Sequence, residues 1–196
     1  MSITNIRFDT DKPLTMDLLR DYASFKDEIT YAFKDLIEEF NLKLLEPYEG
    51  TILLNGTKCT LKFSYDRGDI GCAFKQHIEA NNQYMVSSVY KFLYPEQVYT
   101  EGNEQENAWD SKVQLSRYSK IINAKLKNIL NGDFSWINEY LKKDKRNGQL
   151  SLFVLGLGSE HPITKKFFGG DRSWESDAEQ YIALNNIILP DNKWNN

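Results

Sequence analysis

TILLNGTKCTLKFSYDRGDIGCAFKQH, residues 51–77, is the stretch of sequence that decides the fold. Asn55-Gly56 separates two β-prone runs, and such a pair favours a tight hairpin because both residues tolerate positive φ. A second turn signal follows at residues 66–69, after which the chain becomes apolar again. The stretch therefore predicts three antiparallel strands. The predicted partners across the strands are Tyr65 with Ile70, Phe63 with Cys72, Leu61 with Phe74, Cys59 with Gln76, and Ile52 with Cys59.

This register produces one continuous apolar face. Its members are Ile52, Leu54, Cys59, Leu61, Phe63, Tyr65, Ile70, Cys72 and Phe74. Thr60, Lys62 and Ser64 point the other way. Alternation that agrees across neighbouring strands is typical of an antiparallel sheet with one face on the core. Residues 83–94, QYMVSSVYKFLY, are predicted to add a fourth strand that ends at Pro95.

Helical spacing of apolar residues marks both flanks of this sheet. Residues 15–40 predict a helix whose outer face is acidic, and residues 110–130 predict a second helix that Asn131-Gly132 ends. The apolar side of the first helix consists of Leu18, Tyr22, Phe25, Ile29, Ala32, Phe33, Leu36 and Phe40.

The C-terminal part is predicted to mix helix and strand. A helix is expected to start near residues 133–135 and to end at Asn147-Gly148. The run QLSLFVLGL, residues 149–157, then predicts a buried strand, and the tail SWESDAEQYIALNNIILP, residues 173–190, predicts a short helix with an extended end. The predicted fold class is α+β, with helices packed on one face of a mostly antiparallel sheet in a single domain over residues 1–196.

The composition indicates a soluble protein with a substantial core. Of the 196 residues, 41% are hydrophobic and 13% aromatic, which is too apolar for a disordered chain. The N-terminal sequence MSITNIRFDTDKP has no apolar signal segment, and no run of about 18 apolar residues predicts a membrane span. Two cysteines are too few for a disulfide scaffold. We expect a cytoplasmic location.

Acidic residues gather in two regions. Residues 9–49 contain eleven acids and five bases, many of them on the outer face of the helix over 15–40. A second acidic region is the loop before the helix over 110–130, where aromatic residues accompany the acids. Acids speed the encounter with a basic protein, and aromatics anchor the complex. The predicted binding residues are Glu96, Tyr99, Glu101, Glu104, Glu106, Trp109 and Asp110.

The glycine-rich region over 156–174 raises the possibility of an enzyme. LFVLGLGSEHP lacks the third glycine of a dinucleotide fingerprint and the Gly-Lys-Ser/Thr of a phosphate loop, so we interpret Gly156 and Gly158 as a turn. GGDRSW, residues 169–174, is interpreted as a glycine turn before a helix. As an alternative, this region builds a catalytic site from dispersed polar residues: Ser159, Glu160, His161, Asp171 and Arg172.

Metal and nucleic-acid binding receive less support. His77 and Glu79 match half of a zinc deaminase motif, but the Pro-Cys-x-x-Cys half is missing. Cys59 and Cys72 fit a hairpin core, so no metal and no cofactor are predicted. A further alternative is a nucleic-acid-associated protein that uses the basic helices over 112–146. Their bases are Lys112, Arg117, Lys120, Lys125, Lys127, Lys142, Lys143, Lys145 and Arg146.

The leading hypothesis is a non-catalytic protein-binding module. A soluble, acidic, tryptophan- and tyrosine-bearing chain without a catalytic motif has the profile of small inhibitors that neutralise a toxin, bacterial immunity proteins among them. The expected partner is a basic toxin, whose active site the acidic surface would occlude.

Overall fold

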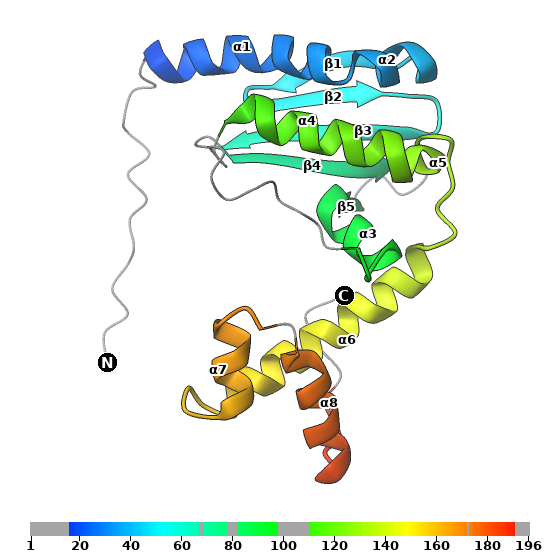
Figure 1. The fold of residues 1–196 in the computed structure, drawn as a ribbon. Helices are drawn as coiled ribbons and strands as arrows, with labels where there is room; N and C mark the ends of the chain where they lie inside the picture. Colours follow the sequence, from blue (N-terminus) through cyan, green and yellow to red (C-terminus); the bar gives the residue numbers. More distant parts are fainter. Residues whose placement is uncertain (1–15, 67–68, 78–81, 98–109, 172, 191–196) are drawn as a thin grey trace. The chain divides into compact units, whose positions relative to one another are not determined.

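The computed structural model describes residues 16–66, 69–77, 82–97, 110–171 and 173–190, and the side chains from residue 24 onward within the first of these ranges. By its internal packing the chain divides into two compact units, residues 1–134 (unit 1) and 135–196 (unit 2). Figure 1 shows the elements of each. Unit 1 contains the sheet and unit 2 is helical. The α+β fold class is confirmed, whereas one domain over residues 1–196 stays a prediction.

Unit 1 is built on a five-stranded antiparallel meander in the order β1-β2-β3-β4-β5. The strands are β1 (Lys43–Tyr48), β2 (Thr51–Asn55), β3 (Cys59–Asp66), β4 (Asp69–Gln76) and β5 (Gln83–Met85). Every predicted pair between β3 and β4 is confirmed, from Tyr65–Ile70 to Cys59–Gln76. Cys59 and Cys72 are therefore not opposite each other, and both are free thiols.

The predicted register of the first hairpin is wrong. Ile52 lies opposite Phe63, not Cys59, because the turn sits two residues later than the Asn-Gly signal. Gly56 N donates to Cys59 O at 3.0 Å, so the tip of the hairpin is at Thr57 and Lys58. The slip is an even number of residues, so the same side chains still face the core. A Cβ on Gly56 would lie 2.9 Å from the Leu42 side chain. Close packing at this position therefore favours glycine, which has no Cβ.

The helices of unit 1 cover the predicted apolar face (Figure 1). They are α1 (Met16–Ala32), α2 (Lys34–Phe40), α3 (Val86–Leu93), α4 (Ser111–Ile121), the π-helical turn η1 (Ile122–Leu126) and α5 (Lys127–Leu130). The core is aromatic at its centre: Phe33 meets Phe63 edge-on at 4.8 Å, and Phe25 meets Tyr65 at 5.2 Å. Both phenylalanines of the first pair are fully buried. Two elements expected as single helices are thus interrupted, at Phe33 and at η1.

Two further predictions in unit 1 are corrected. Of the strand predicted over residues 83–94, only Gln83–Met85 pair with β4, and α3 follows. Val86, Val89 and Tyr90 are buried at helical spacing, which favours the helix. Residues 43–48, for which the sequence pattern predicts no strand, form the edge strand β1. Pro47 is tolerated there because an edge leaves N–H groups unpaired.

Unit 2 consists of α6 (Ile137–Gly156), α7 (Pro162–Phe168) and α8 (Trp174–Leu184). The strand predicted for residues 149–157 is wrong, because α6 continues through Asn147-Gly148 to Gly156. Leu150 and Val154 are four apart and bury one helix face against Ile163, Ala178 and Ile182 of the other two helices. The predicted tail helix is confirmed as α8.

The glycine turn at residues 169–170 is confirmed, whereas the interpretation of Gly156 and Gly158 as a turn after a strand is correct only in that Gly158 lies in a turn. Gly158 has a φ of +88° and Gly170 a φ of +72°, conformations that favour glycine. Gly156 needs no such freedom, because it lies at the end of α6 and a Cβ added to it would meet no atom within 4 Å. The turn at Gly158 therefore follows a helix and connects it to α7, rather than leaving a strand.

Candidate functional site

Unit 1 contains a groove between α1 and α4, with a volume of about 1190 Å³. The wall formed by α1 and the start of α2 carries Asp27, Glu28, Lys34 and Asp35, a net charge of -2. The α4 and η1 wall carries Lys112 and Lys120, a net charge of +2, and otherwise small or neutral residues. The groove thus has one acidic and one basic side, and it is larger than the 300–1,000 Å³ that is usual for small-ligand pockets.

Helical periodicity explains the position of the groove. Phe25 and Ile29 turn one face of α1 into the core, and Phe33 follows them at the junction with α2. The other side of these helices lines the groove with Asp27 and Tyr31 of α1 and with Asp35 of α2. Small residues on both walls, among them Ala32 and Ser116, leave the space between the helices unfilled.

Two hydrogen bonds hold the walls of the groove together. Ser119 is buried, and its hydroxyl donates to the Ala32 carbonyl at 2.6 Å. Ser111 donates to the Glu28 carboxylate. The sequence pattern gives no reason to single out either serine, because a short hydroxyl in a helix carries no recognisable motif. These contacts connect α1 to α4 beside the groove.

Tyr31 is the most exposed aromatic among the described residues of unit 1. Its side chain lines the groove and is 87% exposed, and the groove is also lined by Asp27, one turn earlier on α1, and by Asp35 on α2. Tyrosine is enriched at protein interfaces because it combines a large apolar ring with a hydroxyl that hydrogen-bonds. An exposed tyrosine that lines a groove together with two carboxylates suits a partner that presents apolar and cationic groups together.

Most of the predicted binding loop lies outside the described residues. Tyr99, Glu101, Glu104, Glu106 and Trp109 belong to that group. Glu96 is exposed just after α3, and Asp110 is exposed at the start of α4, where its carboxylate accepts the Lys112 N–H at 2.8 Å. Because the next residue, Ser111, contacts Glu28, the end of the loop adjoins the acidic wall of the groove. A common surface for all seven residues stays a prediction.

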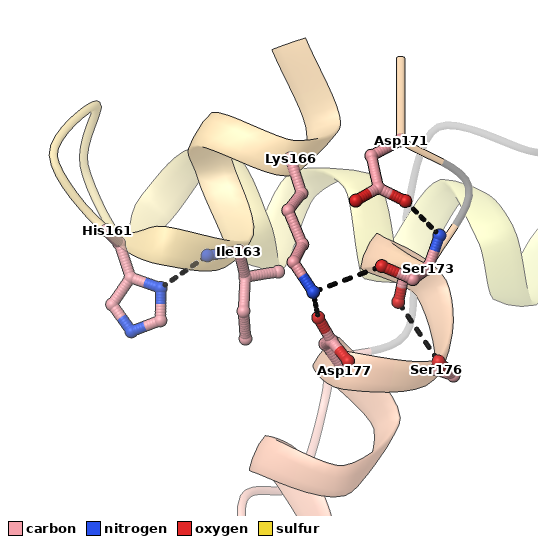
Figure 2. Close-up of polar contacts among 7 residues, drawn as sticks. All are labelled: His161, Ile163, Lys166, Asp171, Ser173, Ser176 and Asp177. Atoms are coloured by element: carbon pink, nitrogen blue, oxygen red, sulfur yellow. Dashed lines mark hydrogen bonds and ion pairs between the residues drawn. The ribbon is translucent and has the colours of Figure 1, made fainter. Parts of the chain in front are cut away.

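The polar residues of the glycine-rich region of unit 2 contact different partners and do not form one group (Figure 2). His161 is the N-cap of α7, and its Nδ1 accepts the Ile163 N–H at 3.3 Å. Its ring packs edge-on against Tyr181 with centroids 5.2 Å apart. Glu160 pairs with Lys165 at 2.9 Å, and Ser159 is exposed. Arg172 lies outside the described residues.

A second polar group in this region centres on Lys166. Its Nζ donates to Ser173 Oγ at 3.1 Å and to Asp177 Oδ2 at 2.5 Å. The hydrogen bond to Asp177 raises the pKa of Lys166, and the Ser173 backbone N–H, at 2.9 Å from Asp171 Oδ1, lowers the pKa of Asp171. Lys166 is therefore a protonated donor and takes no proton from Ser173.

Figure 2 shows the His161 ring pointing away from this Lys166 group. The structure therefore does not join His161 and Asp171 in one acid-base arrangement of the kind that catalysis requires. Catalysis by the 156–174 region stays a prediction without a geometric argument in its favour.

In the described part of the chain, no three His, Cys, Asp or Glu side chains lie close enough together to bind one metal ion. Cys59 and Cys72 are both buried in the sheet core, and burial raises the pKa of Cys59 to about 12. Such thiols stay protonated at neutral pH and are poor ligands. His77 Nε2 instead contacts Thr60 Oγ1 at 2.8 Å, and Glu79 lies outside the described residues.

The basic residues over 112–146 are divided between the two units, and several are paired with acids. Lys127 pairs with Glu39, Lys142 with Glu139, and Arg146 forms a two-point contact with Glu179. Lys125 lies over the Tyr94 ring at 5.4 Å from its centroid. Such pairing reduces the net positive charge available to bind the phosphates of a nucleic acid. Nucleic-acid binding stays a prediction.

Comparisons with known proteins identify no relative: no protein-family model matches the chain, and no curated protein or solved structure matches it at a significant level. Among the described helices, none combines the length and apolar character needed to span a membrane.

Proposed function

We propose that this chain is a non-catalytic protein-binding module that recognises a basic protein through the acidic wall of the α1–α4 groove. The observation that carries the proposal is Tyr31, 87% exposed on the groove that Asp27 and Asp35 also line. The acidic charges increase the rate at which a basic partner associates, and the exposed aromatic ring supplies binding energy once the partner is in place. In its sharpest form the proposal is an inhibitor of the immunity type, which covers the active site of a basic toxin.

Support also comes from the way the acidic regions adjoin. The exposed acids of α1 and the Asp110 end of the predicted binding loop meet at the contact between Glu28 and Ser111. A partner seated on Tyr31 would therefore be within reach of both. The lysines of the opposite wall, Lys112 and Lys120, set the orientation, because a basic group of the partner is repelled there and attracted by α1.

The test begins with affinity capture from cells of the source organism at low and moderate salt, followed by purification of the captured protein and titration against variants. The expected result is one stoichiometric basic partner. Its affinity should fall at least tenfold for Asp27→Lys/Asp35→Lys and for Tyr31→Ala, in line with about 1.4 kcal/mol for each factor of ten. If the partner is an enzyme, binding should also inhibit it.

A matched control is Asp144→Lys, which makes the same charge change at an exposed residue of α6. It should leave the affinity within about twofold, and Lys120→Glu should preserve or strengthen it. Capture of a partner whose affinity responds equally to Asp144→Lys and to the variants at Asp27, Tyr31 and Asp35 would refute recognition through the groove. The absence of any stoichiometric protein partner would refute the function itself.

A further inference from the structure

The sheet of unit 1 has a second face, opposite the helices, whose side chains form regular rows across the strands. We define the open face by three rows that follow from the observed register. The basic row contains Lys43, Asn55, Thr60, Lys75 and Gln83; the apolar row contains Leu45, Leu53, Lys62, Ala73 and Met85; the third row contains Tyr48, Thr51, Ser64 and Gly71.

Large apolar side chains of the open face are exposed. Leu45 is 47% exposed, Met85 41% and Tyr48 61%, whereas Ile52, Leu54 and Phe74 on the helix-covered face are completely buried. The open face therefore combines the polar residues that are usual on the solvent side of a sheet with large apolar side chains that are exposed. Lys62 occupies the middle of the apolar row and Ala73 is buried, so the exposed apolar side chains of this row are Leu45 on β1 and Met85 on β5. Large apolar side chains exposed on both edge strands are features that a partner surface covers.

The charge of the rows near this apolar patch is positive. Lys43 and Lys75 belong to the basic row, and Lys62 reaches toward it, with its Nζ 3.1 Å from Gln83 Oε1. Other bases pair with the carboxylates of Glu38, Glu39, Glu46, Glu139, Glu160, Asp177 and Glu179, and the partner of Glu46 on β1 is Lys26 of α1.

The acids of the open face lie at its far end. Asp66 and Asp69 are opposite each other, two rows beyond the apolar row, or about 13 Å at 3.3 Å per residue. The apolar row is thus bordered by lysines along one side and by the neutral third row along the other. A ligand that covers it meets positive charge on one flank only.

We propose that the open face binds an acidic amphipathic segment of another protein. The segment's apolar side chains would cover Leu45, Leu53 and Met85, and its carboxylates would face Lys43, Lys62 and Lys75. The argument is charge complementarity: apolar burial supplies the attraction, and lysines along one edge of the row select carboxylates and set the orientation. This inference is independent of the proposed function, which concerns the helical layer.

Other ligand classes fit the open face less well. Single-stranded nucleic acids bind sheet faces through aromatic residues on which bases stack, and Tyr48 is the sole aromatic in the three rows, at an edge strand. Leucine and methionine offer no such platform. The row crosses four gaps between strands, about 19 Å, which matches roughly 13 residues of helix. A segment of this length is a peptide-sized ligand.

The test uses three synthetic 16-residue peptides that have the same leucines at helical spacing. All remaining positions are Glu in the first peptide, Lys in the second and Gln in the third. Each is titrated into the ¹⁵N-labelled full-length chain and followed by amide shifts and fluorescence anisotropy. The Glu peptide should bind at least tenfold more tightly than the Gln peptide, and the Lys peptide should not bind. The shifts should fall on β1 to β5, and the affinity should weaken with salt.

Variants separate the contributions. Lys62→Glu/Lys75→Glu should weaken the Glu peptide at least tenfold, and Leu45→Ala should weaken it severalfold while leaving all lysines in place. Lys34→Glu/Lys120→Glu, which makes the same charge change in the helical groove, is the matched control and should leave the affinity unchanged. Dispersed amide spectra establish that each variant is folded.

Three results would overturn the inference. The first is a Glu peptide that binds no better than the Gln peptide. The second is a set of shifts confined to the helices. The third is tighter binding of a 16-nucleotide oligothymidine, or of anionic phosphatidylglycerol vesicles, that the Lys62→Glu/Lys75→Glu variant abolishes, because the face would then recognise phosphate rather than an acidic protein segment.

Discussion

The two compact units differ in how their cores are specified. Unit 1 closes its core with strands that pair across short turns, and a single stretch, residues 51–77, contains three of them. Unit 2 closes its core with side chains of three helices that meet only in space, such as Leu150, Ile163 and Ile182. Local pairing is readable from alternation in the sequence, whereas the packing of separate helices is not. The predictions below test this contrast, in order of expected effect.

The largest effect should come from the aromatic centre of unit 1. Phe63→Ala removes a ring that is completely buried against Phe33 and should lower the free energy of unfolding by about 3–5 kcal/mol. Tyr31→Ala, at a side chain 87% exposed, is the matched control and should change it by less than about 0.5 kcal/mol. Urea unfolding followed by circular dichroism measures both. Equal effects would mean that the Phe63 ring is not in a packed core.

In unit 2, Leu150→Ala should cost about 2–5 kcal/mol, because Leu150 is buried among α6, α7 and α8. Hydrogen exchange with mass spectrometry resolves where protection is lost. We expect the loss to be greatest in peptides of residues 137–184, with less change in β2 to β4. Uniform loss of protection over both units would show that they unfold as one cooperative domain, and would sharpen the question of domain number.

The two glycines at the end of α6 and just after it should respond with opposite signs. Gly158→Ala forces a methyl group into a backbone of φ +88° and should destabilise the protein by about 1–2 kcal/mol. Gly156→Ala, in the last turn of α6 with open space around it, should stabilise it by up to about 1 kcal/mol. Thermal unfolding measures the difference. Destabilisation by both would favour the strand-and-turn interpretation of residues 149–158.

The smallest effect concerns the ion pair between α6 and α8. Arg146 donates two hydrogen bonds to Glu179, and these lower the pKa of Glu179. Because the folded pKa is lowered, the stabilisation is present above the unfolded pKa and disappears as the pH falls through the folded value. Both side chains are more than 40% exposed, so Glu179→Gln should cost only about 0.2–1 kcal/mol at pH 7.

The control for this pair is Glu139→Gln, which breaks the pair with Lys142 within α6. Glu139→Gln should lower the free energy of unfolding less than Glu179→Gln does. The reason is that the Glu139–Lys142 pair joins neighbours on one helix, whereas the Arg146–Glu179 pair joins two helices. Urea unfolding of both variants at pH 7 and near pH 3 provides the comparison. A cost for Glu179→Gln that persists unchanged at pH 3 would contradict the linkage to the carboxylate.

The predictability of the fold follows the same contrast. Alternation identifies which side chains of β2, β3 and β4 face the core, and this survives a wrong turn position because the slip is even. The run over 149–157 misleads because a short apolar segment fits a buried strand and a buried helix equally well. Only the partners Ile163, Ala178 and Ile182, distant in the sequence, select the helix.

The candidate site shows a similar division. Sequence periodicity identifies the acidic outer side of the helix over 15–40, on which Asp27 and Asp35 lie. It does not identify the groove, because the groove depends on α4 lying beside α1 and on the buried contact from Ser119 to Ala32. Nor does it separate His161 from Asp171, since adjacency in a glycine-rich segment says nothing about the direction in which each side chain points.

Local sequence patterns are sufficient to predict the α+β class, the antiparallel strands and the faces of the amphipathic elements, because these depend on periods of two and 3.6 residues within short windows. The tertiary structure alone decided the helical state of residues 149–156, the edge strand at 43–48, the groove and the rows of the open face. Those features depend on contacts between residues far apart in the chain, whose energy enters only once the elements have packed.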